Sequence, residues 1–326
     1  MRERSYSIDI LKFVCAVLVV IVHTNFKFQN AVLPLTRCAV PCFLMISGFL
    51  LYSENKGIGY ERLKRNIKHI FHIMIWSTLL FAVVKEGMSI IHGEFFIPSI
   101  NQWFNFIIFN DNPFGYHLWY LGAYLYVLVI ALVIDKYNMW NSLMCIIPLL
   151  LFGDLIFGKY SLLLLNHEYP FIYVRNFLFV GLPYFMIGVW IKKHKAKLLS
   201  VNMKIYAGGV ILFSVTSILE KIILLNIGMS PAREHYLSTT FLAISLFMFV
   251  LSFKDVKSSR ISLLGGRDSL YIYVFHPLFI ITLPVVIKRL PTVVDLCFQW
   301  TAPFVILILT IILTITLRKR KIKIIK

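Results

Sequence analysis

Two apolar stretches near the start of the chain decide its fold: IDILKFVCAVLVVIVH at residues 8–23 and CAVPCFLMISGFLLY at residues 38–52. With a few flanking residues, each is long enough to cross a hydrocarbon core of about 30 Å. Both carry ionisable groups, because Lys12 and His23 lie in the first stretch and Arg37 precedes the second. A charge at the centre of a membrane helix costs about 2.5–3.5 kcal/mol on insertion scales. We therefore expect these side chains to face a bundle interior or a water-filled cavity.

The composition is that of a multi-pass membrane protein. Of the 326 residues, 59% are hydrophobic and 15% are charged, whereas soluble chains carry about 25% charged residues. The mean hydropathy is +0.79. The net charge of +18 comes from lysines and arginines in short connections, a pattern that sets membrane orientation. The lipid bilayer is therefore the expected partner, and nucleic acid is not expected.

The apolar pattern predicts an all-α integral membrane protein with about ten spanning helices. Their expected ranges are 8–26, 35–52, 68–86, 115–134, 140–157, 171–191, 202–222, 234–253, 268–287 and 293–317. The stretch NQWFNFIIF at residues 101–109 is expected at the membrane interface. We expect one domain over residues 1–326, with a first helix that is retained rather than cleaved and no soluble domain appended.

Lysines and arginines gather on one side of this predicted bundle. That side holds the N-terminus, the connection ENKGIGYERLKRNIKH at 54–69, the run KKHKAK at 192–197 and the basic tail at 318–326. By the positive-inside rule, both termini are predicted to face the cytoplasm.

The five cysteines all lie in or beside apolar runs. Cys38 and Cys42 are one helical turn apart, and no CxxC pair occurs. We interpret the cysteines as small apolar side chains in helices, with a disulfide or a metal site as the less favoured alternatives. No metal is predicted.

On the predicted topology, several ionisable side chains share one depth near the external face. Each has a structural alternative, such as snorkelling to the headgroups, an aromatic belt, or a helix kink. Their shared depth favours a functional cluster, since a histidine is a natural general base and a buried arginine a natural partner for an anionic oxygen. The cluster comprises His23, Arg37, His117, Arg175, Glu220 and Glu234, with His276 lying deeper.

Lys12 and His23 are eleven residues apart, which is close to three helical turns or about 16 Å. Both therefore fall on roughly one face of the first helix. A polar path through the bundle would have this form.

At these residues the sequence resembles the acyltransferase-3 family of membrane acyltransferases. The first helix matches the family pattern with Asp9, Lys12 and His23, although the family usually has Arg where this chain has Lys12. The second helix matches with Arg37, followed by VPCF and SGF. Further matching segments are the RxxR pair of Arg62 and Arg65, HLWYL from His117 and SLYIYVFHP up to His276 and its proline.

The resemblance implies transfer of an acyl group, commonly acetyl, from cytoplasmic acyl-CoA to a hydroxyl of a cell-envelope glycan or similar acceptor. It implies His23 as general base, with Arg37 and His117 stabilising the oxyanion. It also implies that acetyl-CoA is the acyl donor, whose phosphates bind Arg62, Arg65 and Lys12, although plain positive-inside charge explains the two arginines about equally well. Trp119, Arg175 and His276 are expected to bind substrate.

A second reading comes from RNFLFVGLPYFMIG at residues 175–188. Together with HLWYL and VPCFLMISG, this segment looks most like the membrane domains attached to serine racemases of vancomycin resistance. Those domains are linked to serine uptake, so a small-molecule transporter is the alternative function. The predicted location is the cytoplasmic membrane of a bacterium, and neither reading predicts an oligomeric state.

Overall fold

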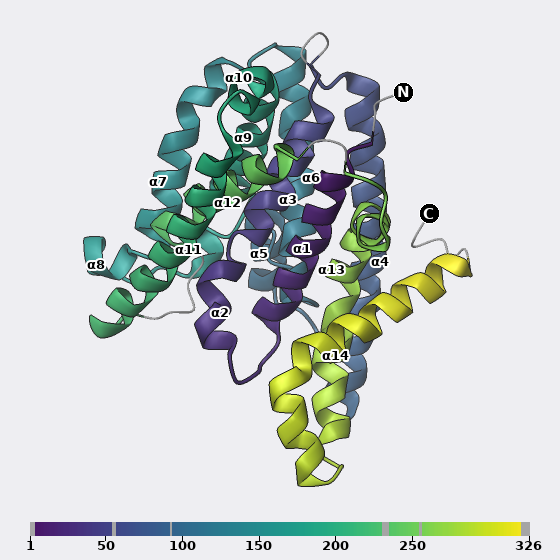
Figure 1. Ribbon diagram of the computed structural model, residues 1–326. Coiled ribbons are helices and arrows are strands. Elements are labelled where there is room, and N and C mark those ends of the chain that lie inside the picture. Colours follow the sequence, from purple (N-terminus) through teal and green to yellow (C-terminus); the bar gives the residue numbers. More distant parts are fainter. Residues whose placement is uncertain (1–3, 54–56, 92, 230–234, 254–255, 321–326) are drawn as a thin grey trace. The chain divides into compact units, whose positions relative to one another are not determined.

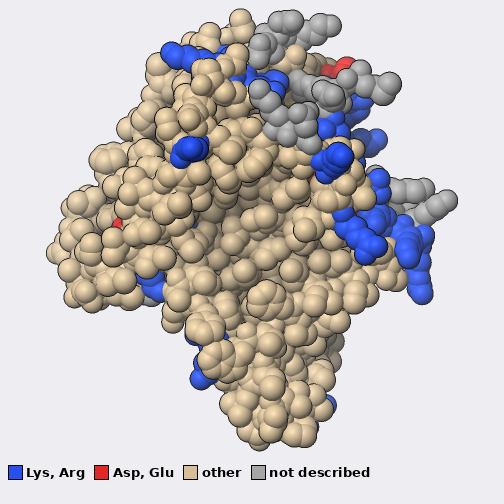
Figure 2. All heavy atoms as spheres, in the orientation of Figure 1, with Lys and Arg blue, Asp and Glu red and all other residues tan. Residues whose placement is uncertain are grey.

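The computed structural model describes residues 4–53, 57–91, 93–229, 235–253 and 256–320 (Figure 1). Within these ranges the regular elements are helices, and the β-structure is one isolated bridge between Ser53 and Gly57. Most of the face seen in Figure 2 carries neither acidic nor basic side chains, as expected of a surface that meets lipid. The predicted all-helical, multi-pass membrane fold is confirmed.

Seven helical segments of the described chain are long and apolar enough to cross a membrane. Two of the other predicted spans fall on the shorter apolar segments Ser142–Phe157 and Leu237–Leu251. The total of ten spans and the cytoplasmic termini stay predictions. The seven are Tyr6–His23, Gln29–Leu51, Tyr60–Ile91, Tyr116–Lys136, Met203–Asn226, Arg260–Ile287 and Thr292–Lys319.

The chain divides into two compact units, and the prediction of a single domain stays a prediction. Unit 1 comprises residues 1–43, 196–231 and 236–326, and unit 2 comprises residues 44–195 and 232–235. The helices of unit 1 are α1 (Tyr6–His23), α2 (Gln29–Thr36), α11 (Met203–Asn226), α12 (Leu237–Leu251), α13 (Arg260–Ile287) and α14 (Thr292–Lys319).

Unit 2 holds most of the remaining elements. The boundary between the units falls within α3 (Ala39–Leu51) and at the start of α10 (Lys195–Leu199). The elements of unit 2 are α4 (Tyr60–Ile91), α5 (Ile100–Phe109), η1 (Tyr116–Leu118), α6 (Trp119–Lys136), η2 (Ser142–Ile146), α7 (Ile147–Phe157), α8 (Ser161–Leu165), η3 (Phe171–Tyr173), the π-helix η4 (Phe177–Gly181) and α9 (Leu182–Lys193).

The predicted span at 171–191 is divided among η3, η4 and α9. Asn176 precedes the π-helix, and its side-chain oxygen accepts hydrogen bonds from the backbone of Leu178 and Phe179. The predicted interfacial stretch forms α5, which buries none of its side chains and begins with a capping box of Ser99 and Gln102.

In unit 1, α1 packs closely against α13. A Cβ at Gly265 would overlap the main-chain oxygen of Asp9, so the missing side chain lets the two backbones touch. Further along both helices, Ala16 and Val20 of α1 share a buried cluster with Ile272 of α13. Residues later in α1 contact residues later in α13, so the two helices run parallel to each other.

In unit 2, α3 and α9 make a comparable close crossing. A Cβ on Gly48 would overlap the carbonyl oxygen of Phe185, and a Cβ on Gly188 would overlap that of Met45. Small residues at such crossings allow backbones to approach within a membrane. The SGF and YFMIG segments, which carry the sequence resemblance, therefore meet at this crossing.

The predicted second span is interrupted rather than continuous. α2 ends at Thr36, α3 begins at Ala39, and Arg37 lies at the break. Pro41 explains the interruption, because it has no N–H to donate to the carbonyl of Arg37 and its ring crowds that group. The break places Arg37 between two short helices instead of inside one long helix.

The close approach of α1 and α13 can be tested with two glycine-to-alanine changes in unit 1. Gly265→Ala should lower the free energy of unfolding by about 1–3 kcal/mol through overpacking. Gly208→Ala is the matched control, because a Cβ there meets nothing within 4 Å, and it should stabilise α11 by about 0.5–1 kcal/mol. Thermal unfolding in detergent measures both. Equal midpoints for the two variants would contradict the assigned contact.

Candidate active site

In unit 1, His23 at the end of α1 stacks on His276 of α13. The ring centroids are 5.5 Å apart and the ring planes differ by 23°. His276 is fully buried, and its Nδ1 lies 2.7 Å from the carbonyl oxygen of Tyr273. Because a carbonyl only accepts, Nδ1 carries the hydrogen and Nε2 is the acceptor. His23 is half-buried, so its imidazole is partly accessible. The imidazole of His276 lies behind it and is held by the hydrogen bond to Tyr273.

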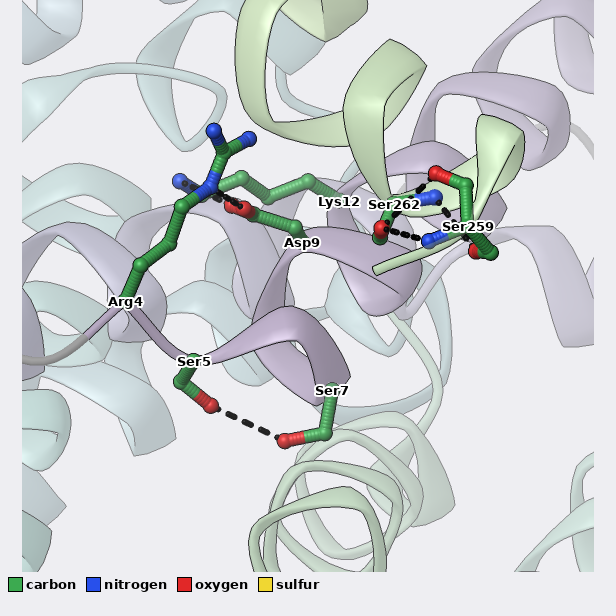
Figure 3. Close-up of polar contacts among 7 residues, drawn as sticks. All are labelled: Arg4, Ser5, Ser7, Asp9, Lys12, Ser259 and Ser262. Atoms are coloured by element: carbon green, nitrogen blue, oxygen red, sulfur yellow. Dashed lines mark hydrogen bonds and ion pairs between the residues drawn. The ribbon is translucent and has the colours of Figure 1, made fainter. Parts of the chain in front are cut away.

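Near the start of α1, Asp9 forms ion pairs with Arg4 and Lys12 (Figure 3). The Nε of Arg4 is 2.7 Å and the Nζ of Lys12 is 3.4 Å from its carboxylate oxygens. A side chain on Gly266 would overlap the Arg4 guanidinium, so this glycine makes room for the cluster. Lys12, predicted to bind phosphate, is therefore an ion-pair partner of Asp9. Its positive charge is partly balanced in the free protein.

Arg37 lies near enough to Tyr236 for an electrostatic interaction between the two side chains. Tyr236 is buried, directly precedes α12 and also interacts electrostatically with Glu220. The carboxylate of Glu220 accepts hydrogen bonds from the backbone N–H of Leu237 at 2.7 Å and of Ser238 at 3.2 Å. Glu220 thus caps the positive end of α12, which is a structural role. Glu234, the other predicted member of this group, lies outside the described residues.

In unit 2, Arg175 and Trp119 come together. The guanidinium carbon of Arg175 lies 5.5 Å from the Trp119 ring centroid and 3.9 Å from that of Phe171. Asp111 is 3.8 Å from the same guanidinium. Burial raises the pKa of Asp111 above its ordinary value, and the charge of Arg175 partly offsets this rise.

His117 is buried in η1, next to Trp119 in sequence. Its ring meets the edge of Phe81 on α4 at 4.5 Å between centroids. Asn112, from the loop that also holds Asp111, donates a hydrogen bond to Thr78 on the same helix at 2.8 Å. The loop and η1 are therefore both anchored on α4, and they hold His117, Trp119 and Asp111 in one region of unit 2.

The structure distinguishes the two arginines of the RxxR pair. Arg62 donates hydrogen bonds to the main-chain oxygens of Leu51 at 2.8 Å and Leu50 at 2.7 Å, and so caps the C-terminal end of α3. Arg65, one turn further along α4, is exposed. Asp135 accepts hydrogen bonds from the backbone N–H groups of Ile58 and Gly59 and orders the start of this helix.

Sequence reasoning missed a buried pair in unit 2. Nδ1 of His235 lies 2.7 Å from a carboxylate oxygen of Asp154, and the exposed fractions of the two side chains are 4% and 2%. Asp154 is on α7, and His235 lies two residues before α12. An acidic side chain inside an apolar run was the available signal, because such residues rarely occur there without a partner.

The predicted site residues are thus distributed over both units. His23 with His276, and Trp119 with Arg175, are brought into contact, while Lys12 and Arg62 each have structural partners. The catalytic and binding roles assigned to these residues stay predictions. All five cysteines are free thiols.

Comparison with known proteins extends the resemblance across the chain. A family model described as an acyltransferase domain, that of the acyltransferase-3 family, matches residues 5–319. Two curated relatives from Enterococcus faecalis, both named amino-acid racemase, are 27% and 30% identical to the chain over 318 and 241 residues.

These alignments cover 89% and 67% of this chain, but 43% and 33% of the two relatives. The chain therefore spans less than half the length of the curated relatives it matches. No solved structure matches the chain.

The different positions of Arg62 and Arg65 predict different effects on stability. Arg62→Ala removes two charged hydrogen bonds from the end of α3 and should cost about 1–3 kcal/mol of unfolding free energy. Arg65→Ala removes the same side chain from an exposed position and should leave stability within about 0.5 kcal/mol of wild type. Thermal unfolding of the two variants in one detergent measures the difference. An Arg62→Ala midpoint equal to that of wild type would exclude the capping role.

Proposed function

The chain belongs to the acyltransferase-3 family of membrane acyltransferases, and from that premise we propose that it is a membrane O-acyltransferase. It would move an acetyl group from cytoplasmic acetyl-CoA to a hydroxyl of a cell-envelope glycan or a related acceptor. The proposed location is the cytoplasmic membrane of a bacterium, with both termini inside. The one-sided distribution of lysine and arginine supports this orientation.

The observation that carries the proposal is the stacked pair of His23 and His276. Transfer to a hydroxyl requires a group that takes its proton as the oxygen attacks the acyl carbon. His23 is half-buried and so open to a substrate, while the fully buried ring of His276 limits how the His23 ring can turn. A base held in one orientation loses little entropy when the acceptor arrives.

The attack leaves negative charge on the acyl oxygen, and this charge needs preorganised donors. Arg37 is the proposed donor in unit 1, where it lies at the break between α2 and α3 rather than within a regular helix. His117 is the proposed donor in unit 2, where its burial supports a fixed orientation. Both donors would act on charge that develops during the reaction, so their loss would reduce kcat.

The phosphates of CoA would bind the basic start of α4 and the Lys12 region. Arg65 is exposed and suited to this role. Arg62 would have to exchange its bonds to α3 for bonds to phosphate, and Lys12 would share its charge with Asp9. Arg65 is therefore the proposed main phosphate ligand, with Arg62 and Lys12 in supporting roles.

Trp119 and Arg175 would contact substrate, and His276, which is fully buried, would act on substrate binding through the ring of His23. Two aromatic rings hold the guanidinium of Arg175, and the several N–H donors of a guanidinium suit a ligand that carries several hydroxyls, such as a sugar. The proposed acceptor is accordingly a hydroxyl-rich molecule of the cell envelope.

A small-molecule transporter is the second candidate function. It is favoured by the interrupted helix at Arg37 and by the π-helix η4, because broken helices line substrate sites in transporters. The substrate would be a serine-like amino acid, in keeping with relatives named amino-acid racemase. Serine uptake into proteoliposomes in the absence of acyl-CoA would identify this function.

The acyltransferase proposal is tested by binding and slow hydrolysis of acetyl-CoA by the purified protein, with water replacing the acceptor. His23→Ala should lower the hydrolysis rate by about 10²–10⁴-fold, the usual contribution of a general base. It should leave the dissociation constant for CoA within two-fold of wild type. Arg65→Ala should show the opposite pattern, with weaker binding and a rate at saturation that is nearly unchanged.

The controls separate folding from function. Thermal unfolding of each variant confirms that the protein remains folded. Failure of the folded wild type to bind acetyl-CoA would overturn the proposal and direct attention to serine uptake. Hydrolysis by His23→Ala at the wild-type rate would remove His23 from the mechanism.

A further inference from the structure

We propose that the Asp154–His235 pair of unit 2 is a binding site for a hydroxyl group. The inference rests on the proposed function in one respect, namely that the hydroxyl belongs to the acyl acceptor. The pair itself is defined by geometry, with 2.7 Å between Nδ1 of His235 and the carboxylate of Asp154 and almost complete burial of both side chains.

The carboxylate decides which hydrogen bond the imidazole can offer. A carboxylate accepts, so Nδ1 of His235 carries the hydrogen that is donated to Asp154. In its neutral form, an imidazole that donates from Nδ1 accepts one hydrogen bond at Nε2. A hydroxyl satisfies this acceptor, whereas an ester or carbonyl oxygen does not.

The surroundings fix the pair in place. The ring of Tyr184 on α9 lies edge-on to His235, with 5.7 Å between centroids. Gly153, next to Asp154, faces the ring of Phe179 in η4, where a Cβ would be too close. η4 therefore packs against α7 beside Asp154, and Tyr184 of α9 packs against the His235 ring.

The segment before η4 lies against the end of α7, the helix that carries Asp154. A Cβ on Gly158, at the end of α7, would touch Val174, which directly precedes Arg175 and Asn176. Both of these polar side chains are buried. A buried polar group is costly to leave without a hydrogen bond, so an imidazole held in this orientation favours a ligand that offers hydroxyl donors. The chemical class of the ligand is a sugar or polyol.

The inference predicts that substitutions of Asp154 or His235 change how the acetyl group is partitioned between a sugar hydroxyl and water. Acetyl-CoA is supplied with a high concentration of methyl glucoside, and two products, acetyl-glucoside and free acetate, are measured. The ratio of the two does not depend on the fraction of protein that is active. Asp154→Asn and His235→Gln should each lower this ratio at least ten-fold, while acetate formation remains within about two-fold of wild type.

Asp154→Asn is informative because an amide can donate to Nδ1 and thereby reverse the tautomer of His235. His69→Gln, an exposed histidine of α4 in the same unit, is the matched control and should leave the ratio unchanged. A wild-type ratio equal to those of Asp154→Asn and His235→Gln overturns the inference. Absence of acetate formation by the folded wild type would instead overturn the proposed function, and this inference with it.

Discussion

The contact between Gly265 and the main-chain oxygen of Asp9 determines how α1 lies on α13. Without a side chain at Gly265, the two helices approach until their backbones touch, and their relative register is fixed there. Asp9 then lies beside Gly266 with Arg4 and Lys12 on its carboxylate. At the other end of α1, the same register brings His23 against His276. The geometry of the imidazole pair is thus a consequence of one glycine eleven residues earlier on α13.

Hydrophobicity alone predicted the helices well where one apolar run coincides with one regular helix. α14 was expected at 293–317 and extends over Thr292–Lys319. The prediction failed to show the break at Arg37 and the 32-residue length of α4. Both differences come from the ends of helices, where proline geometry and capping groups decide the outcome and mean hydropathy carries no information.

Sequence motifs identified many residues of the candidate site. They did not predict which side chains contact one another, and those contacts determine what each residue can do. His23 and His276 were both selected from the sequence, but their stacking was not. Arg62 and Arg65 look equivalent as an RxxR pair, and only the carbonyl groups at the end of α3 distinguish them. Asp154 and His235 are 81 positions apart in the chain, so no local pattern could have joined them.

The π-helix η4 has a consequence for how this protein can change over evolutionary time. A π-turn holds one more residue than an α-turn. Deleting a single residue from Phe177–Gly181 would restore regular α-helical winding and rotate the whole of α9 by about 100° relative to the preceding segment. Tyr184 would then leave the edge of His235, and Gly188 would leave Met45. Homologous chains that keep both contacts must therefore also keep the length of this turn, even where its side chains differ.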